Sequence, residues 1–325
     1  MRLGMENATR LKLFLKGMAM GAADVVPGVS GGTIAFISGI YEELLASIKA
    51  VGPDTLTALR KGGIKGAWEQ VNGNFLLPLF LGIGTSIVLL VRPITWALHH
   101  EPVLIWGFFF GLIAASVWLC GKLVAKWGAG PVVGLLAGTA AAVVIGLLDP
   151  GDGSMSLPFF FIAGAIAICA MILPGISGSF ILLLLGAYLP VMTAIKTFDV
   201  TVIAVFAGGC LFGLMAFSRL LNWMFRTHHD LTVATLTGFL LGSLTIIWPW
   251  KEVLSTRMVH AGKPDEHLEA FITRNVLPSD YGTITEIDRM LGVTAKDPNL
   301  FGAIALAVLG ALLLVVFDRL GPKRA

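Results

Sequence analysis

The stretch VVPGVSGGTIAFISGIY at residues 25–41 recurs as ILPGISGSFILLLLGAY at residues 172–188, and the two align without a gap. Both contain Pro-Gly-x-Ser-Gly, with a Gly and a Tyr at matching positions downstream. Proline removes a helical hydrogen-bond donor, and glycine frees the backbone to turn. Each copy therefore predicts a break inside an apolar segment. The recurrence predicts a duplicated chain, with halves at 1–149 and 150–325.

The chain as a whole is too poor in charge for a water-soluble protein. Of its 325 residues, 56% are hydrophobic and 13% are charged, with a mean hydropathy of +0.85. Soluble proteins carry about 25% charged residues. We therefore expect an all-α polytopic membrane protein, forming a single transmembrane domain over 1–325.

The net charge of +3 gives no support for a nucleic-acid partner. Apolar runs predict crossings at 75–91, 102–121, 130–148, 200–218, 231–250 and 299–317.

The two broken stretches, 11–48 and 157–195, are too long for one crossing each. If each is a re-entrant hairpin, 15 of the 23 Lys and Arg residues fall on the inner side, together with both termini. If each spans once, the basic residues divide more evenly, so the positive-inside rule favours hairpins. Each half then has three crossings. Because three is odd, the second half is inverted relative to the first, as in many secondary transporters.

Three segments outside the crossings have their own predicted structure. Residues 53–70 predict a basic amphipathic helix on the inner membrane surface. Residues 251–298 predict an extracytoplasmic insertion, with short helices at 264–275 and 283–291.

The chemistry of the two broken segments favours an anion. A helix that begins after a break offers free N–H groups and a partial positive charge of about half a unit. Ser30, Thr33, Ser177 and Ser179 add hydroxyl donors. Two such tips, approaching from opposite faces, would form a site suited to phosphate above all. The alternative is that the glycines only allow close helix packing.

Asp24 lies three residues before Pro27 in an apolar stretch, and Met171 occupies its place in the second copy. Intramembrane acids are often proton or cation sites, so Asp24 is a candidate for proton coupling. It could instead accept a hydrogen bond from the tip's own backbone. Arg92 and Arg219 could attract an anionic head group or anchor their helices by snorkelling.

No catalytic or metal site is predicted. The histidine pairs His99-His100 and His228-His229 fall on opposite membrane faces in the inverted topology, so they cannot share a metal. The sequence has no enzyme motif in a usable context. We therefore expect neither an enzyme nor a bound metal or cofactor, and the sequence indicates no oligomeric state.

The duplicated motifs PGVSGGT (27–33) and PGISGS (174–179), with GMAMGAADVV (17–26), resemble the PopT-type bacterial polyprenyl-phosphate transporters. The resemblance covers about residues 12–317. It implies a flippase that returns undecaprenyl phosphate, the lipid carrier of cell-wall synthesis, from the outer to the inner leaflet of the cytoplasmic membrane. The head-group residues that it implies are Gly28, Ser30, Gly31, Gly32, Thr33, Gly175, Ser177, Gly178 and Ser179. The second tip departs from the first, with Ser179-Phe180 in place of Gly32-Thr33.

Together these observations predict alternating access. The head group would bind between the tips while the prenyl chain stays in lipid, and the inverted halves would rock about the site. Two alternatives stay open. One is a transporter or channel for a small water-soluble anion. The other is an intramembrane lipid-phosphate enzyme.

Overall fold

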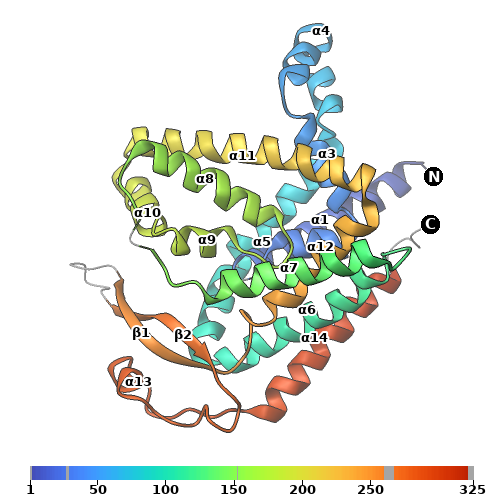
Figure 1. The fold of residues 1–325 in the computed structure, drawn as a ribbon. Coiled ribbons are helices and arrows are strands. Elements are labelled where there is room, and N and C mark those ends of the chain that lie inside the picture. Colours follow the sequence, from blue (N-terminus) through green and yellow to red (C-terminus); the bar gives the residue numbers. More distant parts are fainter. Residues whose placement is uncertain (1, 27–28, 152, 260–266, 321–325) are drawn as a thin grey trace.

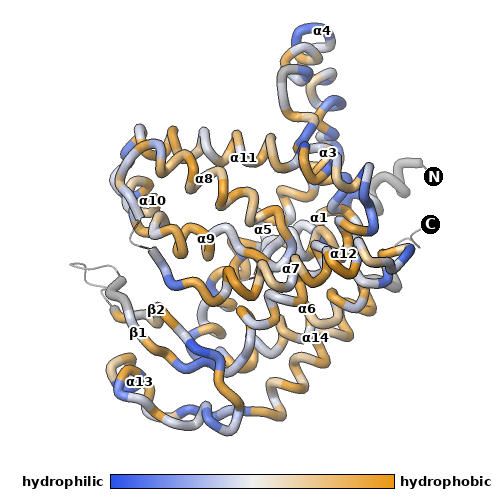
Figure 2. The backbone as a smooth tube through the Cα atoms, in the orientation of Figure 1, coloured by the Kyte–Doolittle hydropathy of each residue, from blue (hydrophilic) through white to orange (hydrophobic). Residues whose placement is uncertain are grey.

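The computed structural model describes residues 2–26, 29–151, 153–259 and 267–320. Within these residues the chain forms fourteen helices and one two-stranded sheet (Figure 1). Hydrophobic residues dominate most of the helices, while hydrophilic residues gather in α4, near the strands and at helix ends (Figure 2). The elements are α1 (Arg2–Asp24), α2 (Gly31–Ile37), α3 (Tyr41–Ala50), α4 (Pro53–Gln70), α5 (Gly73–His100), α6 (Pro102–Gly121), α7 (Ala129–Leu147), α8 (Leu157–Ile172), α9 (Gly178–Leu184), α10 (Tyr188–Thr197), α11 (Val200–Thr227), α12 (His229–Ser243), β1 (Lys251–Val259), β2 (His267–Asn275), α13 (Glu286–Met290) and α14 (Leu300–Leu320).

Four helices of the described chain, α5, α6, α7 and α11, are long and apolar enough to cross a membrane. Helix α8 and residues 300–316 of α14 are apolar but shorter. The predicted all-α polytopic membrane fold is therefore confirmed. The predicted crossing at 231–250 is wrong in its second part, because α12 ends at Ser243. Pro249 disfavours a helical conformation in the residue before it, which opposes an extension to residue 250.

Each broken segment contains a short helix after its first, longer one. The seven-residue α2 packs against α1, and the seven-residue α9 packs against α8. In Figure 1, α9 runs back toward the end of the molecule where α8 begins. A further bend of 106° separates α9 from α10. This bend is that of a broken span or of a re-entrant loop, so the re-entrant hairpins stay a prediction.

Helices of equal length recur in the same order. Helices α2 and α9 have seven residues each, α3 and α10 have ten, and α5 and α11 have 28. Arg92 and Arg219 each occupy the twentieth position of their 28-residue helix. The same series of lengths therefore occurs twice along the chain.

Four long helix pairs form the body of the molecule. Helix α1 packs on α5 and α8 packs on α11, whereas α6 packs on α14 and α7 packs on α12. Glycines allow this close approach. A Cβ at Gly138 of α7 would lie 3.1 Å from the backbone nitrogen of Phe239, and one at Gly238 of α12 would lie 2.9 Å from that of Thr139. Helices α6 and α7 thus take their partners from the later part of the chain.

The predicted helix at 53–70 is confirmed as α4, which extends away from the rest of the molecule (Figure 1). It is kinked at Gly63, whose φ of 60° lies in the left-handed region that glycine adopts readily. Leu56 and Ile64 are exposed, as the amphipathic pattern requires. Its position on the inner membrane surface stays a prediction.

Residues 251–298, called the outer segment after their predicted extracytoplasmic location, contain a β-hairpin in place of one expected helix. Strand β1 pairs antiparallel with β2, so the predicted helix at 264–275 is wrong. Ile272 and Thr273 are β-branched and favour a strand once a partner strand is available. The short helix predicted at 283–291 is confirmed by α13.

A buried ion pair holds the end of the outer segment. Lys296 Nζ donates to Asp288 Oδ2 at 2.6 Å, and the two side chains are only 8% and 1% exposed. The N–H and the hydroxyl of Thr285 donate to the same oxygen at 2.9 Å each. Burial raises the pKa of Asp288, but the hydrogen bonds from Lys296 and Thr285 outweigh it, so the pKa lies below its ordinary value.

We expect Asp288→Asn to lower the free energy of unfolding of the outer segment by about 3–5 kcal/mol, because Lys296 would stay buried without its carboxylate.

A dependence on pH is also expected. In the unchanged protein the folded-state pKa of Asp288 is depressed. Its contribution is therefore present above an ordinary carboxyl pKa of about 4 and is lost as the pH falls below it. Amide hydrogen exchange across residues 276–298 measures both effects. The control Glu286→Gln changes an exposed carboxylate in the same helix. Equal exchange in the Asp288 and Glu286 variants would contradict the expectation.

Candidate functional site

The first tip lies between α1 and α2, and its donors are already used. Ser30 is the N-cap of α2, and its Oγ accepts from the Gly32 N–H at 3.1 Å. The Gly31 N–H donates to Asp24 Oδ1 at 2.6 Å, and the Thr33 N–H donates to the Ser30 carbonyl at 2.9 Å. A carboxylate and a capping hydroxyl therefore satisfy the positive end of α2. Gly28 lies outside the described residues.

The second tip lies between α8 and α9, and fewer of its donors are used, although residues 174–178 are buried. Gly175 has a φ of +87°, which lets the chain turn where another residue would be strained. Ser177 is the N-cap of α9 but makes no side-chain cap, and its Oγ lies 2.8 Å from Ser179 Oγ. Ser179 is exposed. Within the described residues, no acceptor is recorded for the N–H groups of Gly178 and Ser179.

The two tips meet through three hydrogen bonds. Ser30 Oγ donates to the Met171 carbonyl at 2.9 Å, and the Gly175 N–H donates to Thr33 Oγ1 at 2.9 Å. The Tyr41 hydroxyl donates to the Ile172 carbonyl at 3.0 Å. The hydroxyls of the first tip thus bind the backbone of the second.

Close packing accompanies these bonds. Ser30 and Thr33 are buried. A Cβ at Gly32 would lie 2.6 Å from the Ile172 carbonyl oxygen, so only glycine fits without a shift of backbone. Eight of the nine predicted head-group residues therefore lie in two contacting regions, each a short loop and the first turn of the helix that follows it, the exception being the undescribed Gly28.

The difference between the tips rests on one pair of positions. Asp24 is partly buried and its carboxylate occupies the end of α2. Met171, the aligned residue, is 44% exposed and carries no charge. One of the two interpretations of Asp24 is that it accepts a hydrogen bond from the tip's own backbone. The Gly31 N–H makes this bond. A role of Asp24 in proton coupling stays a prediction.

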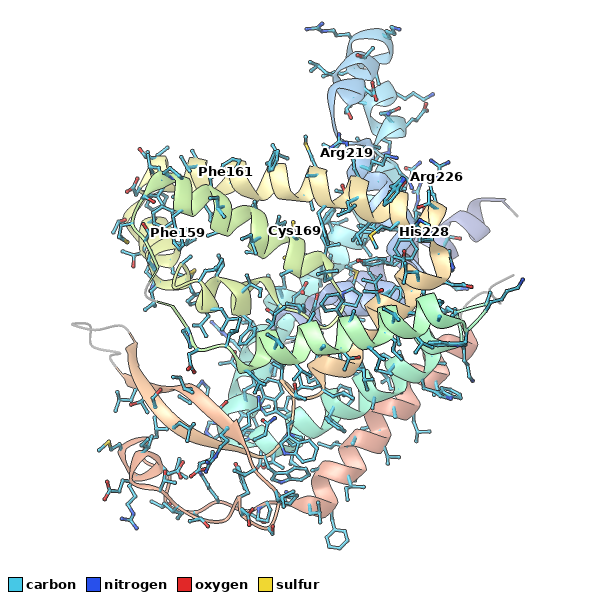
Figure 3. The ribbon with its side chains drawn as sticks, viewed as in Figure 1. Phe159, Phe161, Cys169, Arg219, Arg226 and His228 are labelled. Atoms are coloured by element: carbon cyan, nitrogen blue, oxygen red, sulfur yellow. The ribbon has the colours of Figure 1, made fainter. Side chains whose placement is uncertain are left out.

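The predicted arginines lie apart from the hydrogen bonds that join the tips. Arg92 is exposed on α5. Arg219 donates from Nη1 to the Met215 carbonyl at 2.9 Å on its own helix, and it lies on the part of α11 near α3 (Figure 3). Neither makes a recorded contact with the described tip residues.

The histidine pairs occupy different places. His99 and His100 line a cavity beneath the outer segment, whereas His228 and His229 line another beside Asp230. Asp230 Oδ1 and Oδ2 accept from the backbone N–H groups of Ala125 and Lys126, which lower the pKa of this carboxyl.

Tyr41 was not among the predicted site residues, although its hydroxyl joins the tips. The sequence feature that could have indicated it is the matching Tyr188 at the same position in the second copy. The contact itself depends on how α3 sits beside α8, which the spacing does not reveal.

Comparison with known proteins identifies the family. Residues 20–264 match the VCA0040-like family, described as undecaprenyl phosphate translocase-like. A polyprenyl-phosphate transporter of Vibrio cholerae serotype O1 is 48% identical over 275 residues, covering 85% of this chain and 88% of that protein. A polyprenyl-phosphate transporter of Staphylococcus aureus is 36% identical over 256 residues, covering 72% of this chain and 85% of that protein. No solved structure gives a significant match.

These names are those of transporters and not of enzymes, which confirms both the predicted resemblance and the predicted non-enzymatic class. Because the family model matches residues 20–264, which include both Pro-Gly-x-Ser-Gly tips, this protein belongs to the undecaprenyl phosphate translocase-like family.

Proposed function

We propose that this chain transports polyprenyl phosphate, specifically undecaprenyl phosphate from the outer to the inner leaflet of a bacterial cytoplasmic membrane. The family match and the printed names of two relatives support the substrate class. The apolar helices support a membrane location. The start of α1 and the end of α14 lie at the same end of the molecule (Figure 1), which agrees with both termini in the cytoplasm. The lipid and the membrane are the proposed partners.

The observation that carries the proposal is the difference between the tips. At the first tip, Asp24 supplies the chain's own anion to the end of α2. At the second tip, the aligned Met171 supplies none. The bond between the Ser177 and Ser179 hydroxyls leaves one O–H donor, and the N–H groups of Gly178 and Ser179 have no recorded acceptor, so these donors can turn to an external anion. Phosphate oxygens accept hydrogen bonds from such donors. We therefore place the head group at Gly175, Ser177, Gly178 and Ser179 in this arrangement of the halves.

The first tip would join the site when the tips separate. Rocking of one predicted half against the other would break the three bonds between the tips and would also shift the α6–α14 and α7–α12 contacts that join the halves. The hydroxyls of Ser30 and Thr33 would then be free to bind phosphate, with Gly31 and Gly32 providing close backbone approach. The repeated series of helix lengths supports two such halves, at 1–149 and 150–325. Arg92 and Arg219 would attract head groups in the two leaflets before they reach the tips.

The test is reconstitution in liposomes that carry undecaprenyl phosphate in one leaflet, with leaflet exposure and phosphate release followed together. Movement without release supports the transporter. Release of phosphate supports the intramembrane enzyme. Passage of an inorganic anion without lipid movement supports the small-anion transporter or channel and contradicts the proposal.

Proton coupling is tested by Asp24→Asn. We expect the variant to lose any dependence of lipid movement on a pH gradient, because the amide cannot take up and release a proton. The amide oxygen can still accept from the Gly31 N–H, so the fold of the tip should persist. The control Glu42→Gln removes an exposed carboxylate at the start of α3. A dependence that survives in the Asp24 variant would exclude this residue from coupling.

A further inference from the structure

A cavity of about 780 Å³ lies beneath the outer segment, and it will be called the outer cavity. Its wall comprises the corner between α5 and α6, two residues of α9, the stretch after α12, and residues of β1, β2 and the segment beyond α13. This volume falls within the range of about 300–1,000 Å³ that is typical of small-molecule sites. Neither the proposed tip site nor the names of the relatives assigns it a role.

Lys251 brings a positive charge to this cavity, and its recorded contacts are with uncharged groups. Its Nζ donates to the Ile246 carbonyl at 2.5 Å and lies 4.3 Å from the centre of the Trp106 ring. Both partners are uncharged. The other lysine of the wall, Lys296, is neutralised by Asp288. Within the described residues, no ion pair to Lys251 is recorded.

The other titratable groups of the wall are His99, His100, Glu101, Tyr281, Asp288, Lys296 and Asp297. Glu101 and Asp297 give the wall more acidic than basic side chains, but no ion pair from either of them to Lys251 is recorded among the described residues. Burial lowers the pKa of Lys251 to about 8, which agrees with the lack of a paired carboxylate. The ammonium form therefore predominates at neutral pH, ready to receive an anion.

The outer cavity also adjoins the second tip. Phe180 and Leu183 of α9 line it, and Phe180 directly follows the exposed Ser179. Ile246 and Pro249 add further apolar wall. A ligand with an anionic end and an apolar chain would thus find both of its parts matched, close to the donors of the tip.

We propose that the outer cavity is the extracytoplasmic docking site for a prenyl phosphate monoester, with Lys251 as the cation that first receives the phosphate. The proposal rests on the proposed function and deepens it, because it gives the lipid a place to bind before the second tip. The first isoprene units would lie against Phe180 and Leu183. The ammonium would add a charge-assisted hydrogen bond to the phosphate.

Binding of farnesyl phosphate to the purified full chain in detergent tests this directly by calorimetry. We expect Lys251→Met to weaken binding about tenfold or more, since charge-assisted hydrogen bonds contribute about 1.5–3 kcal/mol. Lys251→Arg should retain binding, and Lys196→Met should leave it unchanged because Lys196 is exposed and outside the cavity wall. Equal affinity of the Lys251→Met variant and the unchanged protein would overturn the proposal. So would inorganic phosphate that binds as tightly as farnesyl phosphate.

A second measurement needs no variant, in case Lys251→Met does not fold. Labelling of Lys251 by an amine-reactive ester is followed by mass spectrometry, with and without farnesyl phosphate. We expect the bound lipid to slow this labelling about fivefold while labelling of Lys196 stays constant. Unchanged labelling of Lys251 at saturating farnesyl phosphate would overturn the proposal.

Transport assays separate the two levels of inference. If the unchanged protein moves undecaprenyl phosphate and Lys251→Met does so with the same dependence on lipid concentration, docking at Lys251 is wrong and the proposed function stands. If the unchanged protein moves no lipid, the proposed function fails. In that case the farnesyl phosphate experiments still decide whether the outer cavity binds a prenyl phosphate.

Discussion

Replacing Gly32 with alanine is expected to reduce lipid transport about 5- to 150-fold. The added Cβ would lie 2.6 Å and 3.0 Å from the carbonyl oxygens of Ile172 and Met171, which belong to the backbone of the other tip. Overpacking of this kind costs about 1–3 kcal/mol. Because that energy is needed only where the tips touch, it depopulates the arrangement in which they are joined. The measurement is the initial rate of undecaprenyl phosphate movement in liposomes, normalised to inserted protein.

Gly84→Ala is the matched control, because Gly84 is a helical glycine of α5 with no atom within 4 Å of an added Cβ. It should transport at the normal rate and melt at the normal temperature. Equal rates for the Gly32 and Gly84 variants would show that contact between the tips is not required for transport.

The double variant Ser177→Ala/Ser179→Ala is expected to lower the apparent affinity for undecaprenyl phosphate about tenfold or more. Hydrogen bonds to a charged group contribute about 1.5–3 kcal/mol each, and both hydroxyls lie where no side-chain anion competes for them. Neither hydroxyl bonds to the first tip among the described contacts. The packing of the tips should therefore persist.

The chain offers a second pair of hydroxyls as a control. Ser154 Oγ donates to Ser156 Oγ at 3.1 Å, with the same spacing in sequence, in the exposed loop before α8. Ser154→Ala/Ser156→Ala should transport normally. A tip variant that also transports normally, at the same level in the membrane, would remove the two hydroxyls from the proposed site.

The helix breaks and most of the crossings could be predicted because their causes are local. Pro174 and Gly175 end α8 through backbone chemistry, and long apolar runs require helices in hydrocarbon. The β-hairpin could not be predicted in the same way. Residues 267–275 form a strand because residues 251–259 pair with them, and that partner is not visible within either segment alone.

The candidate site shows the same division. The hydroxyls and glycines of both tips could be named from the motif, and the unequal charge at Asp24 and Met171 from the alignment of the copies. The hydrogen bond from the Gly175 N–H to Thr33 Oγ1 spans 142 residues and depends on how the two broken segments dock. The position of Lys251 in a cavity wall could not be predicted from the sequence, because the cavity is formed by residues distant in sequence, such as Trp106.

The crosswise pairing of α6 with α14 and of α7 with α12 constrains how the protein is made. When the ribosome has finished α7, neither α6 nor α7 has met the helix that it packs against in the final fold. Both must wait in the bilayer, with their glycine-lined faces against lipid, until about 90 to 180 further residues have been synthesised. Neither half is therefore an autonomous folding unit, and a chain divided near residue 150 would regain its structure only if both pieces were inserted into the same membrane.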